Sequence, residues 1–294
     1  MSDFAASAVP LTGGYGGQTF AVSAGDEDAV IKFYARDPER AAVDASLLEL
    51  VRGLLPVPRV LDLKRDGSFE DPPYLLTERL PGINLQVFLE SATDEERRRV
   101  GTQLGELLAR LSGMPFLRSG MFRGGELTVE PFGFGDLAEY VAGLRLGFDD
   151  RQREGFAAVI DEAEDVLADG VHRVCLVHSD FNPKNLLVDP GTVRITGLID
   201  WEFAHAGSPY ADLGNLLRFS EDRILAGAVL DALRGMGLGE RLVDLGRAAD
   251  LWALLDLAER AAEHEVAAAA HRLVSRMADT GTLAGGRPDL DVVH

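Results

Sequence analysis

Short apolar runs bounded by turn residues dominate the N-terminal third of the chain. Candidate strands flank the glycine-rich segment 11–20, a further apolar run covers 29–34, and another covers 73–80 before a Pro-Gly break. Between the last two runs, residues 38–53 form a helical stretch with proline near its start and glycine as a stop signal. Runs of this length are typical of β-strands. The pattern predicts a strand-rich N-terminal part with one helix.

Beyond residue 90 the apolar positions recur at helical spacing. Residues 93–96 form a Thr-x-x-Glu capping box, and leucines follow at positions 104, 107, 108 and 111. Residues 115–135 are rich in glycine and phenylalanine without periodicity, which predicts an irregular insertion near a substrate site, and 280–294 predicts a loose tail. Helices are predicted at about 93–111, 136–146, 149–168, 210–219, 221–235, 239–263 and 264–278.

Polar residues lie where apolar runs end in the middle of the chain. The run 174–177 is followed by Asp180 and Asn185, and a predicted hairpin over 186–199, with an Asp-Pro-Gly turn, is followed by Asp200. Strand ends can present such side chains to a shared cleft, where oxygens bind Mg2+ and one carboxylate accepts a proton. A single aspartate in a turn is more often a turn former. The hypothesis of a phosphoryl-transfer centre therefore depends on the whole string.

That string reads HSDFNPKN and then LIDWEFAHAGSPYADLGNLL. It resembles the catalytic segment of the aminoglycoside phosphotransferase and choline kinase superfamily, the small-molecule relatives of protein kinases. The resemblance implies that Asp180 is the catalytic base and that His178 orients the loop. It also implies that Asn185 and Asp200 bind Mg2+.

Three further positions belong to the same segment. By the resemblance, Asp212 is a buried aspartate that braces the catalytic loop from the next helix. Ser179 stands where the family often has glycine, a departure that we expect to be tolerated because serine is small. Lys184 lies outside the family pattern, and a solvated loop charge and a phosphate-neutralising role both stay open for it.

One lysine, Lys32, lies inside the apolar run 29–34. An unpaired ammonium is costly to bury, so this side chain needs an anionic partner. The resemblance casts Lys32 as a contact of the ATP phosphates and places its partner on the following helix, where the family has Glu and this chain has Asp44. Glu49 is the less favoured alternative, because it lies five positions later on a different face of the helix.

The segment 11–20 supplies a candidate phosphate loop, since glycines let backbone N–H groups approach phosphate oxygens closely. The spacing matches neither a Walker loop nor a dinucleotide fingerprint, and a plain hairpin turn is an equal alternative. The candidate residues are Gly13, Gly14, Gly16 and Gly17.

The run 73–80 resembles the hinge between the two lobes of these kinases. The resemblance implies that backbone groups of Glu78 and Leu80 bind adenine, and an ordinary edge strand is the alternative. We therefore expect an α+β, bilobal protein-kinase-like fold. Its N-terminal antiparallel sheet lobe, residues 1–80, would bind the nucleotide, and its larger helical lobe, residues 81–294, would carry catalysis and the substrate site.

Composition agrees with a cytoplasmic enzyme. The chain of 294 residues is 46% apolar, which gives ample core. It has no apolar run of 18 residues and its first ten residues lack the features of a signal peptide, so we expect no membrane partner. The single cysteine, Cys175, excludes an intrachain disulfide.

The net charge of −19 argues against nucleic acid and anionic membranes as partners, because both require a cationic surface. It suits a cationic substrate, although many proteins are acidic simply for solubility. The acids that we predict near the acceptor are Glu202, which follows Asp200 closely, and Asp256 and Glu259, which share one face of a late helix.

The sequence thus predicts an ATP-dependent phosphotransferase that uses Mg2+ and phosphorylates a hydroxyl of a small molecule. An aminoglycoside or other amino-bearing antibiotic is one candidate acceptor, and a metabolic amino alcohol or sugar is another. A nucleotide-binding pseudokinase is the non-enzymatic alternative. A protein kinase is disfavoured, because no Phe-Gly follows Asp200 and no Ala-Pro-Glu segment is present. Oligomeric state and a preference for GTP stay open.

Overall fold

The computed structural model describes residues 8–11, 18–24, 27–68, 70–133 and 136–290. The chain forms two compact units. The first unit comprises the residues up to Thr93 together with Gly120–Glu130 and Asn182–Ala206; the second comprises Asp94–Ser119, Pro131–Phe181 and the residues from Gly207 onward. The expected lobe boundary at residue 80 stays a prediction.

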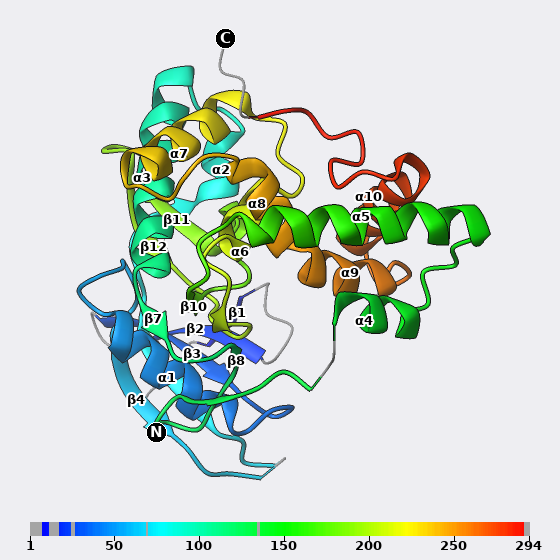
Figure 1. Ribbon diagram of the computed structural model, residues 1–294. Helices are drawn as coiled ribbons and strands as arrows, with labels where there is room; N and C mark the ends of the chain where they lie inside the picture. Colours follow the sequence, from blue (N-terminus) through cyan, green and yellow to red (C-terminus); the bar gives the residue numbers. More distant parts are fainter. Residues whose placement is uncertain (1–7, 12–17, 25–26, 69, 134–135, 291–294) are drawn as a thin grey trace. The chain divides into compact units, whose positions relative to one another are not determined.

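A five-stranded antiparallel sheet is the centre of the first unit (Figure 1). Apolar side chains of alternate positions form its core, including Val22, Ala29 and Leu76. Helix α1 (Arg40–Val51) packs against β4 and β5 and confirms the predicted helix. In spatial order the strands are β1 (Val9–Pro10), β2 (Gln18–Ala24), β3 (Glu27–Phe33), β5 (Tyr74–Glu78) and β4 (Val60–Lys64).

A second sheet in this unit contains the hairpin predicted from the sequence. Leu186, the first residue of β11, pairs with Leu198, the last residue of β12. The residues just before and just after the hairpin therefore lie at the same end of it. Gly82 has φ +114°, and a Cβ there would lie 2.7 Å from the Val188 carbonyl oxygen, so only glycine fits at this position. The elements are β6 (Ile83–Asn84), α2 (Leu85–Leu89), the 3-10 helix η1 (Pro183–Asn185), β11 (Leu186–Asp189) and β12 (Arg194–Leu198).

The prediction of irregular structure at 115–135 was wrong for residues 115–130, which contain short strands, while its expected place near the substrate site stays a prediction. Strands β8 (Gly120–Arg123) and β9 (Thr128–Glu130) form an antiparallel hairpin, and β8 also pairs with β13 (His205–Gly207). Strands of three or four residues are too short to show an alternation of apolar and polar positions. Phe122 of β8 is buried.

The second unit is mainly helical, so the predicted α+β class is confirmed. Helices α3 (Asp94–Ser112) and α7 (Arg223–Gly235) pack side by side, and α5 (Asp150–Ala168) packs on α8 and α10 (Figure 1). The short strand β10 (Val174–Val177) pairs with β7 (Pro115–Phe116) and leads into the predicted catalytic segment. The remaining helices are α4 (Leu137–Gly143), α6 (Ala211–Leu217), α8 (Leu242–Ala249), α9 (Leu251–Glu259) and α10 (Glu265–Thr280).

Two predictions for the C-terminal part were wrong. The single helix expected at 239–263 is interrupted at Asp250, whose buried carboxylate binds Arg218. Residues 280–290 of the expected loose tail pack on the rest of the second unit, since Leu283 and Leu290 are buried and Arg247 donates to the Pro288 carbonyl at 2.6 Å. Among the described helices, none is both long and apolar enough to cross a membrane.

Candidate active site

The catalytic segment begins at the end of β10, in the second unit. The backbone N–H groups of His178 and Ser179 donate to the two carboxylate oxygens of Asp212, each at 2.8 Å. Asp212 lies in α6 and is buried. Asp212 thus braces the loop from the next helix, as the sequence predicts.

The backbone of this loop requires an unusual conformation. Ser179 has φ +68°, in the left-handed region that glycine adopts at low cost, which explains why glycine suits this position in the family. Asn215 of α6 donates to the Ser179 carbonyl at 3.5 Å and so supports the turn. The Asp180 N–H donates to the Nδ1 atom of the buried His178 at 3.3 Å. This bond fits the expected role of His178 in orienting the loop.

The two predicted metal ligands lie in the first unit, on adjoining strand ends. The Ile199 N–H donates to the Asn185 carbonyl at 2.9 Å, which places Asp200 just beyond Asn185. Asn185 is buried, and Asp200 has φ +65°. The register of β11 and β12 therefore brings these two oxygen-bearing side chains to the same end of the hairpin.

The donor set fits Mg2+ bound together with a nucleotide. In the described ranges, no group of three or more His, Cys, Asp or Glu side chains gathers as a metal site. Mg2+ is usually held in nucleotide sites by one or two protein oxygens, with phosphates and waters as the other ligands. Asp200 already attracts a cation, because the Lys32 ammonium lies 3.0 Å from its Oδ1 atom.

Lys32 projects from β3 and has two carboxylate partners. Its Nζ atom lies 3.0 Å from Asp200 Oδ1 and 3.0 Å from Glu202 Oε2, and its side chain is only 14% exposed. Burial opposes the charged form, but the carboxylates of Asp200, Asp44 and Glu202 outweigh it and raise the pKa of Lys32. The strand lysine is therefore held charged, with the anionic partners that its burial demands.

Asp44 was expected to pair with Lys32, and here the structure differs. The Asp44 carboxylate accepts from Arg40 Nε at 2.6 Å and from the Tyr34 hydroxyl at 2.7 Å. It acts on Lys32 through its charge. Aspartate is one methylene shorter than glutamate. Arg40, one helical turn earlier, binds its carboxylate instead. The alternative acid, Glu49, pairs with Arg52 on the helix surface.

Glu202 was predicted as an acid near the acceptor. Its side chain is only 6% exposed and binds Lys32, so the structure places it beside the predicted phosphate contact. Sequence reasoning missed this partnership, because the two residues are 170 positions apart. It also missed Arg40, although an Arg four residues before Asp44 on one helix face was a readable signal.

The structure describes the predicted hinge residues Glu78 and Leu80 but not the predicted phosphate loop. The Glu78 N–H donates to the Arg59 carbonyl at 3.0 Å, so an adenine contact from Glu78 would have to use its carbonyl. Leu80 lies two residues beyond it, with a side chain near Gly197. The four glycines of the candidate phosphate loop lie outside the described residues.

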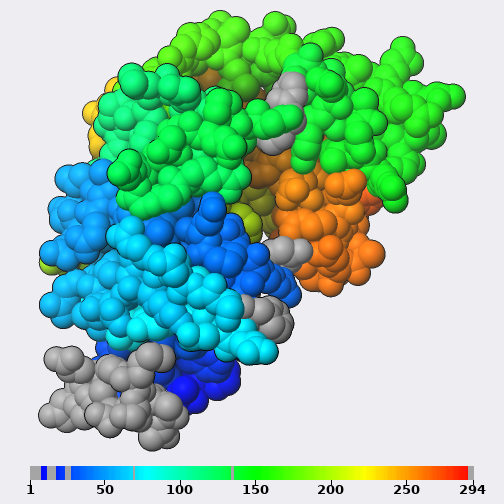
Figure 2. Space-filling model, turned by 90° about the horizontal axis from the view of Figure 1, so that it is seen from below, coloured from blue at the N-terminus to red at the C-terminus, as the bar shows by residue number. Residues whose placement is uncertain are grey.

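The late-helix acids Asp256 and Glu259 are exposed on α9, whose surface is orange in Figure 2. Asp256 pairs with Arg260 at 2.6 Å, and Glu259 accepts from the Arg145 N–H at 3.3 Å. The ring of Trp252 on the same helix lies 4.8 Å from that of Tyr140 in α4. The two acids lie on one helix face, as predicted, beside an aromatic pair.

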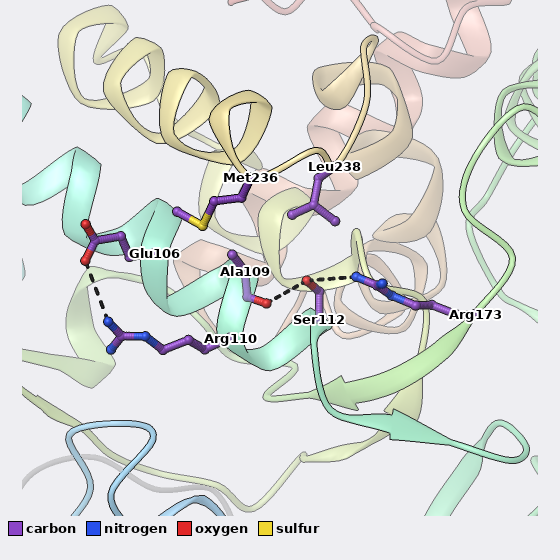
Figure 3. A pocket seen from close by; sticks show the side chains of 7 residues that line it. All are labelled: Glu106, Ala109, Arg110, Ser112, Arg173, Met236 and Leu238. Atoms are coloured by element: carbon purple, nitrogen blue, oxygen red, sulfur yellow. Dashed lines mark hydrogen bonds and ion pairs between the residues drawn. The ribbon is translucent and has the colours of Figure 1, made fainter.

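A surface cavity of about 290 Å3 in the second unit contains none of the predicted site residues (Figure 3). Its polar side chains bind one another: Arg110 lies 3.8 Å from Glu106, and Arg173 lies 3.5 Å from the Ser112 hydroxyl. It is therefore distinct from the catalytic segment. The lining residues are Glu106, Ala109, Arg110, Ser112, Arg173, Met236 and Leu238.

The brace residue Asp212 leads to a prediction about pH. Burial raises the pKa of its carboxyl from 3.8 to about 7, against the two backbone hydrogen bonds that lower it. Because the folded protein then holds this proton more tightly than the unfolded chain, the stabilisation is complete below about pH 4 and is lost as pH rises through about 7. We expect the free energy of unfolding of the wild type, minus that of Asp212→Asn, to fall over this window in urea titrations. A flat difference would contradict the raised pKa.

Comparison with known proteins identifies the family. The family model described as "Phosphotransferase enzyme family" matches residues 7–249. The chain is 30% identical over 194 residues to an aminoglycoside 3'-phosphotransferase of Streptomyces fradiae, which covers 62% of this chain and 67% of that protein. It is 25% identical over 166 residues to acyl-CoA dehydrogenase family member 10 of Mus musculus, covering 54% of this chain but only 15% of that much longer protein.

Solved structures show the same fold. A crystal structure of aminoglycoside phosphotransferase APH(4)-Ia aligns with a TM-score of 0.69 at 20% identity, covering 96% of this chain and 95% of that one. The N-terminal antiparallel sheet and the helical C-terminal region agree with this match. The chain belongs to the phosphotransferase enzyme family.

Proposed function

We propose that this protein is an ATP-dependent phosphotransferase that phosphorylates a hydroxyl of a small molecule. The observation that carries the proposal is the position of Lys32, a half-buried, charged lysine paired with the predicted metal ligand Asp200. A lysine bound by two carboxylates is suited to exchange one of them for nucleotide phosphates, which are also anionic. Family membership supports the same reaction class.

In the proposed reaction Asp180 accepts the proton of the acceptor hydroxyl as its oxygen attacks the γ-phosphorus of ATP. The bond between that phosphorus and the β,γ-bridging oxygen breaks, and ADP leaves. Lys32 binds phosphate oxygens. Bound Mg2+, held by Asn185 and Asp200 with the phosphates, would offset negative charge on the transferred group. Asp212 fixes the loop that carries the base.

The acceptor is proposed to include amino-bearing compounds. The Streptomyces relative is named for aminoglycosides, and a ternary complex of an APH(4)-Ia mutant contains ADP and hygromycin B. The exposed acids Asp256 and Glu259 can attract ammonium groups. A metabolic amino alcohol or sugar fits the same reaction. A similar structure of another family member contains GDP, so the nucleotide must be tested as well. The proposal includes a cytoplasmic location, where ATP is available.

The test is Mg2+-dependent ADP release in a coupled assay against polyamine antibiotics, amino alcohols and neutral sugars, repeated with GTP. We expect one chemical class of acceptor to stimulate release, and EDTA to abolish it. Mass spectrometry of the acceptor should show the added phosphoryl group. Binding of ATP without stimulation by any compound would favour the pseudokinase and contradict the proposal.

A further inference from the structure

Helix α1 is joined to the turn after Asp200 by one buried side chain, that of Arg40. Its Nη2 atom lies 2.5 Å from the Trp201 carbonyl oxygen and 3.4 Å from that of Ala204, and its Nη1 atom lies 3.5 Å from the latter. All of these residues belong to the first unit. The guanidinium thus spans both ends of the turn 201–204.

This turn needs such support. Asp200 adopts φ +65°, a left-handed conformation that is strained for a residue with a Cβ atom. Trp201 and Ala204 are buried, and buried carbonyl oxygens require donors. The Ala204 N–H donates to the Trp201 carbonyl at 2.9 Å, which closes the turn, and Arg40 supplies further donors. The strained residue is the proposed metal ligand itself.

Arg40 is in turn held rigidly. Its Nε atom donates to Asp44 Oδ1 at 2.6 Å, and the other Asp44 oxygen accepts from the Tyr34 hydroxyl. All three side chains are buried. In the described part of the chain, no buried side-chain nitrogen or oxygen lacks a hydrogen-bond partner. A buried charge pair of this kind fixes geometry because neither partner can move without leaving the other uncompensated.

We propose that Arg40 is a positioning residue that holds the turn 201–204, so that Asp200 and Glu202 present their carboxylates to one cation. The Lys32 ammonium, 3.0 Å from each, is that cation here. Helix α1 is then coupled to the nucleotide site through Arg40 and the turn, in place of a direct ion pair between Lys32 and the helix acid. This inference rests on the proposed function, because it assigns Asp200 to Mg2+ binding.

The decisive variant is Arg40→Lys. Lysine keeps the positive charge but has a single ammonium, which cannot hold Asp44 and the two carbonyl oxygens together. Loss of a residue that orients a metal ligand typically weakens metal binding by about 10- to 100-fold. We therefore expect the Mg2+ concentration that half-saturates AMP-PNP binding to rise at least about tenfold.

Leu47→Ala is the matched control. Leu47 lies on the same helix and is fully buried, so its truncation lowers the unfolding midpoint without touching the turn. Calorimetric titration of AMP-PNP at a series of Mg2+ concentrations gives the binding constants. Emission of Trp201 in a Trp252→Phe background gives a second readout at the turn, since the chain has only these two tryptophans.

The expected result is a raised Mg2+ requirement in Arg40→Lys and an unchanged one in Leu47→Ala. An unchanged requirement in Arg40→Lys, or an equal shift in both variants, would overturn the proposal. The titration needs no turnover, so a wild type that binds Mg2+ and AMP-PNP but phosphorylates no acceptor would refute the proposed function alone. A wild type whose nucleotide binding ignores Mg2+ would overturn both.

Discussion

Asp180→Asn is expected to lower kcat by about 10²- to 10⁴-fold, the usual contribution of a general base, while leaving the Kd for AMP-PNP unchanged. Asparagine has nearly the shape of aspartate but cannot accept the hydroxyl proton. The loop should keep its conformation, because Asp212 and Asn215 hold it through the backbone groups of His178 and Ser179. The measurement is steady-state kinetics with whichever acceptor proves active, together with calorimetric binding of AMP-PNP.

Asp189→Asn is the matched control. It also removes one carboxylate, but Asp189 is a turn former whose Oδ1 atom accepts from the Gly191 N–H at 2.8 Å. Its kcat should stay at the wild-type value. If kcat of Asp180→Asn fell less than about tenfold, Asp180 would not be the base. If AMP-PNP binding were lost as well, the variant would have disturbed the nucleotide site and the assignment would lose this support.

The hairpin that brings Asn185 and Asp200 to one end could be predicted from the sequence because its parts are local. The loop, the hairpin after it and Asp200 lie within about twenty residues, and the register of a short hairpin fixes which residues meet at its end. The brace by Asp212 followed from the family resemblance and not from a local pattern, because His178 and Asp212 are 34 positions apart.

The partners of buried charges could not be predicted in this way. Lys32 and Glu202 are 170 positions apart, and only the folded first unit brings them together. The family resemblance marked Asp44 as the partner of Lys32, but it could not show that Arg40 would bind this acid instead. Asp250, at which the expected helix is interrupted, binds Arg218, which lies 32 residues earlier. For Lys32 and Asp250 the partner lies outside the window that a local pattern covers, whereas Arg40 lies within it, one helical turn before Asp44.

Asp250→Ala is expected to cause the largest loss of stability, about 3–5 kcal/mol of unfolding free energy. Arg218 at the end of α6 binds Asp250 through two hydrogen bonds, Nε to Oδ2 at 2.8 Å and Nη2 to Oδ1 at 2.6 Å, and the two side chains are 9% and 4% exposed. Truncation would leave a buried guanidinium uncompensated. Guanidinium chloride denaturation measures the difference.

Asp256→Ala provides a closely matched control. Its Oδ2 atom lies 2.6 Å from Arg260 Nη2, the same distance as in the buried pair, but these side chains are 60% and 28% exposed. Solvent screens such a pair, so this variant should lose at most about 1 kcal/mol. Equal losses in the two variants would show that burial does not set the strength of the Arg218–Asp250 pair.

The buried pair also bears on the active site. Gly214 of α6 lies so close to α8 that a Cβ there would be 2.0 Å from the Gly246 carbonyl oxygen. The Arg218–Asp250 pair joins the end of α6 to the residue that follows α8. Since α6 carries Asp212, Asp250→Ala should also loosen the catalytic loop and speed hydrogen exchange at the His178 and Ser179 amides. Faster exchange at these amides in Asp250→Ala but not in Asp256→Ala would link the buried ion pair to the geometry of the proposed base. Unchanged exchange would show that the Arg218–Asp250 pair contributes to stability without affecting the loop.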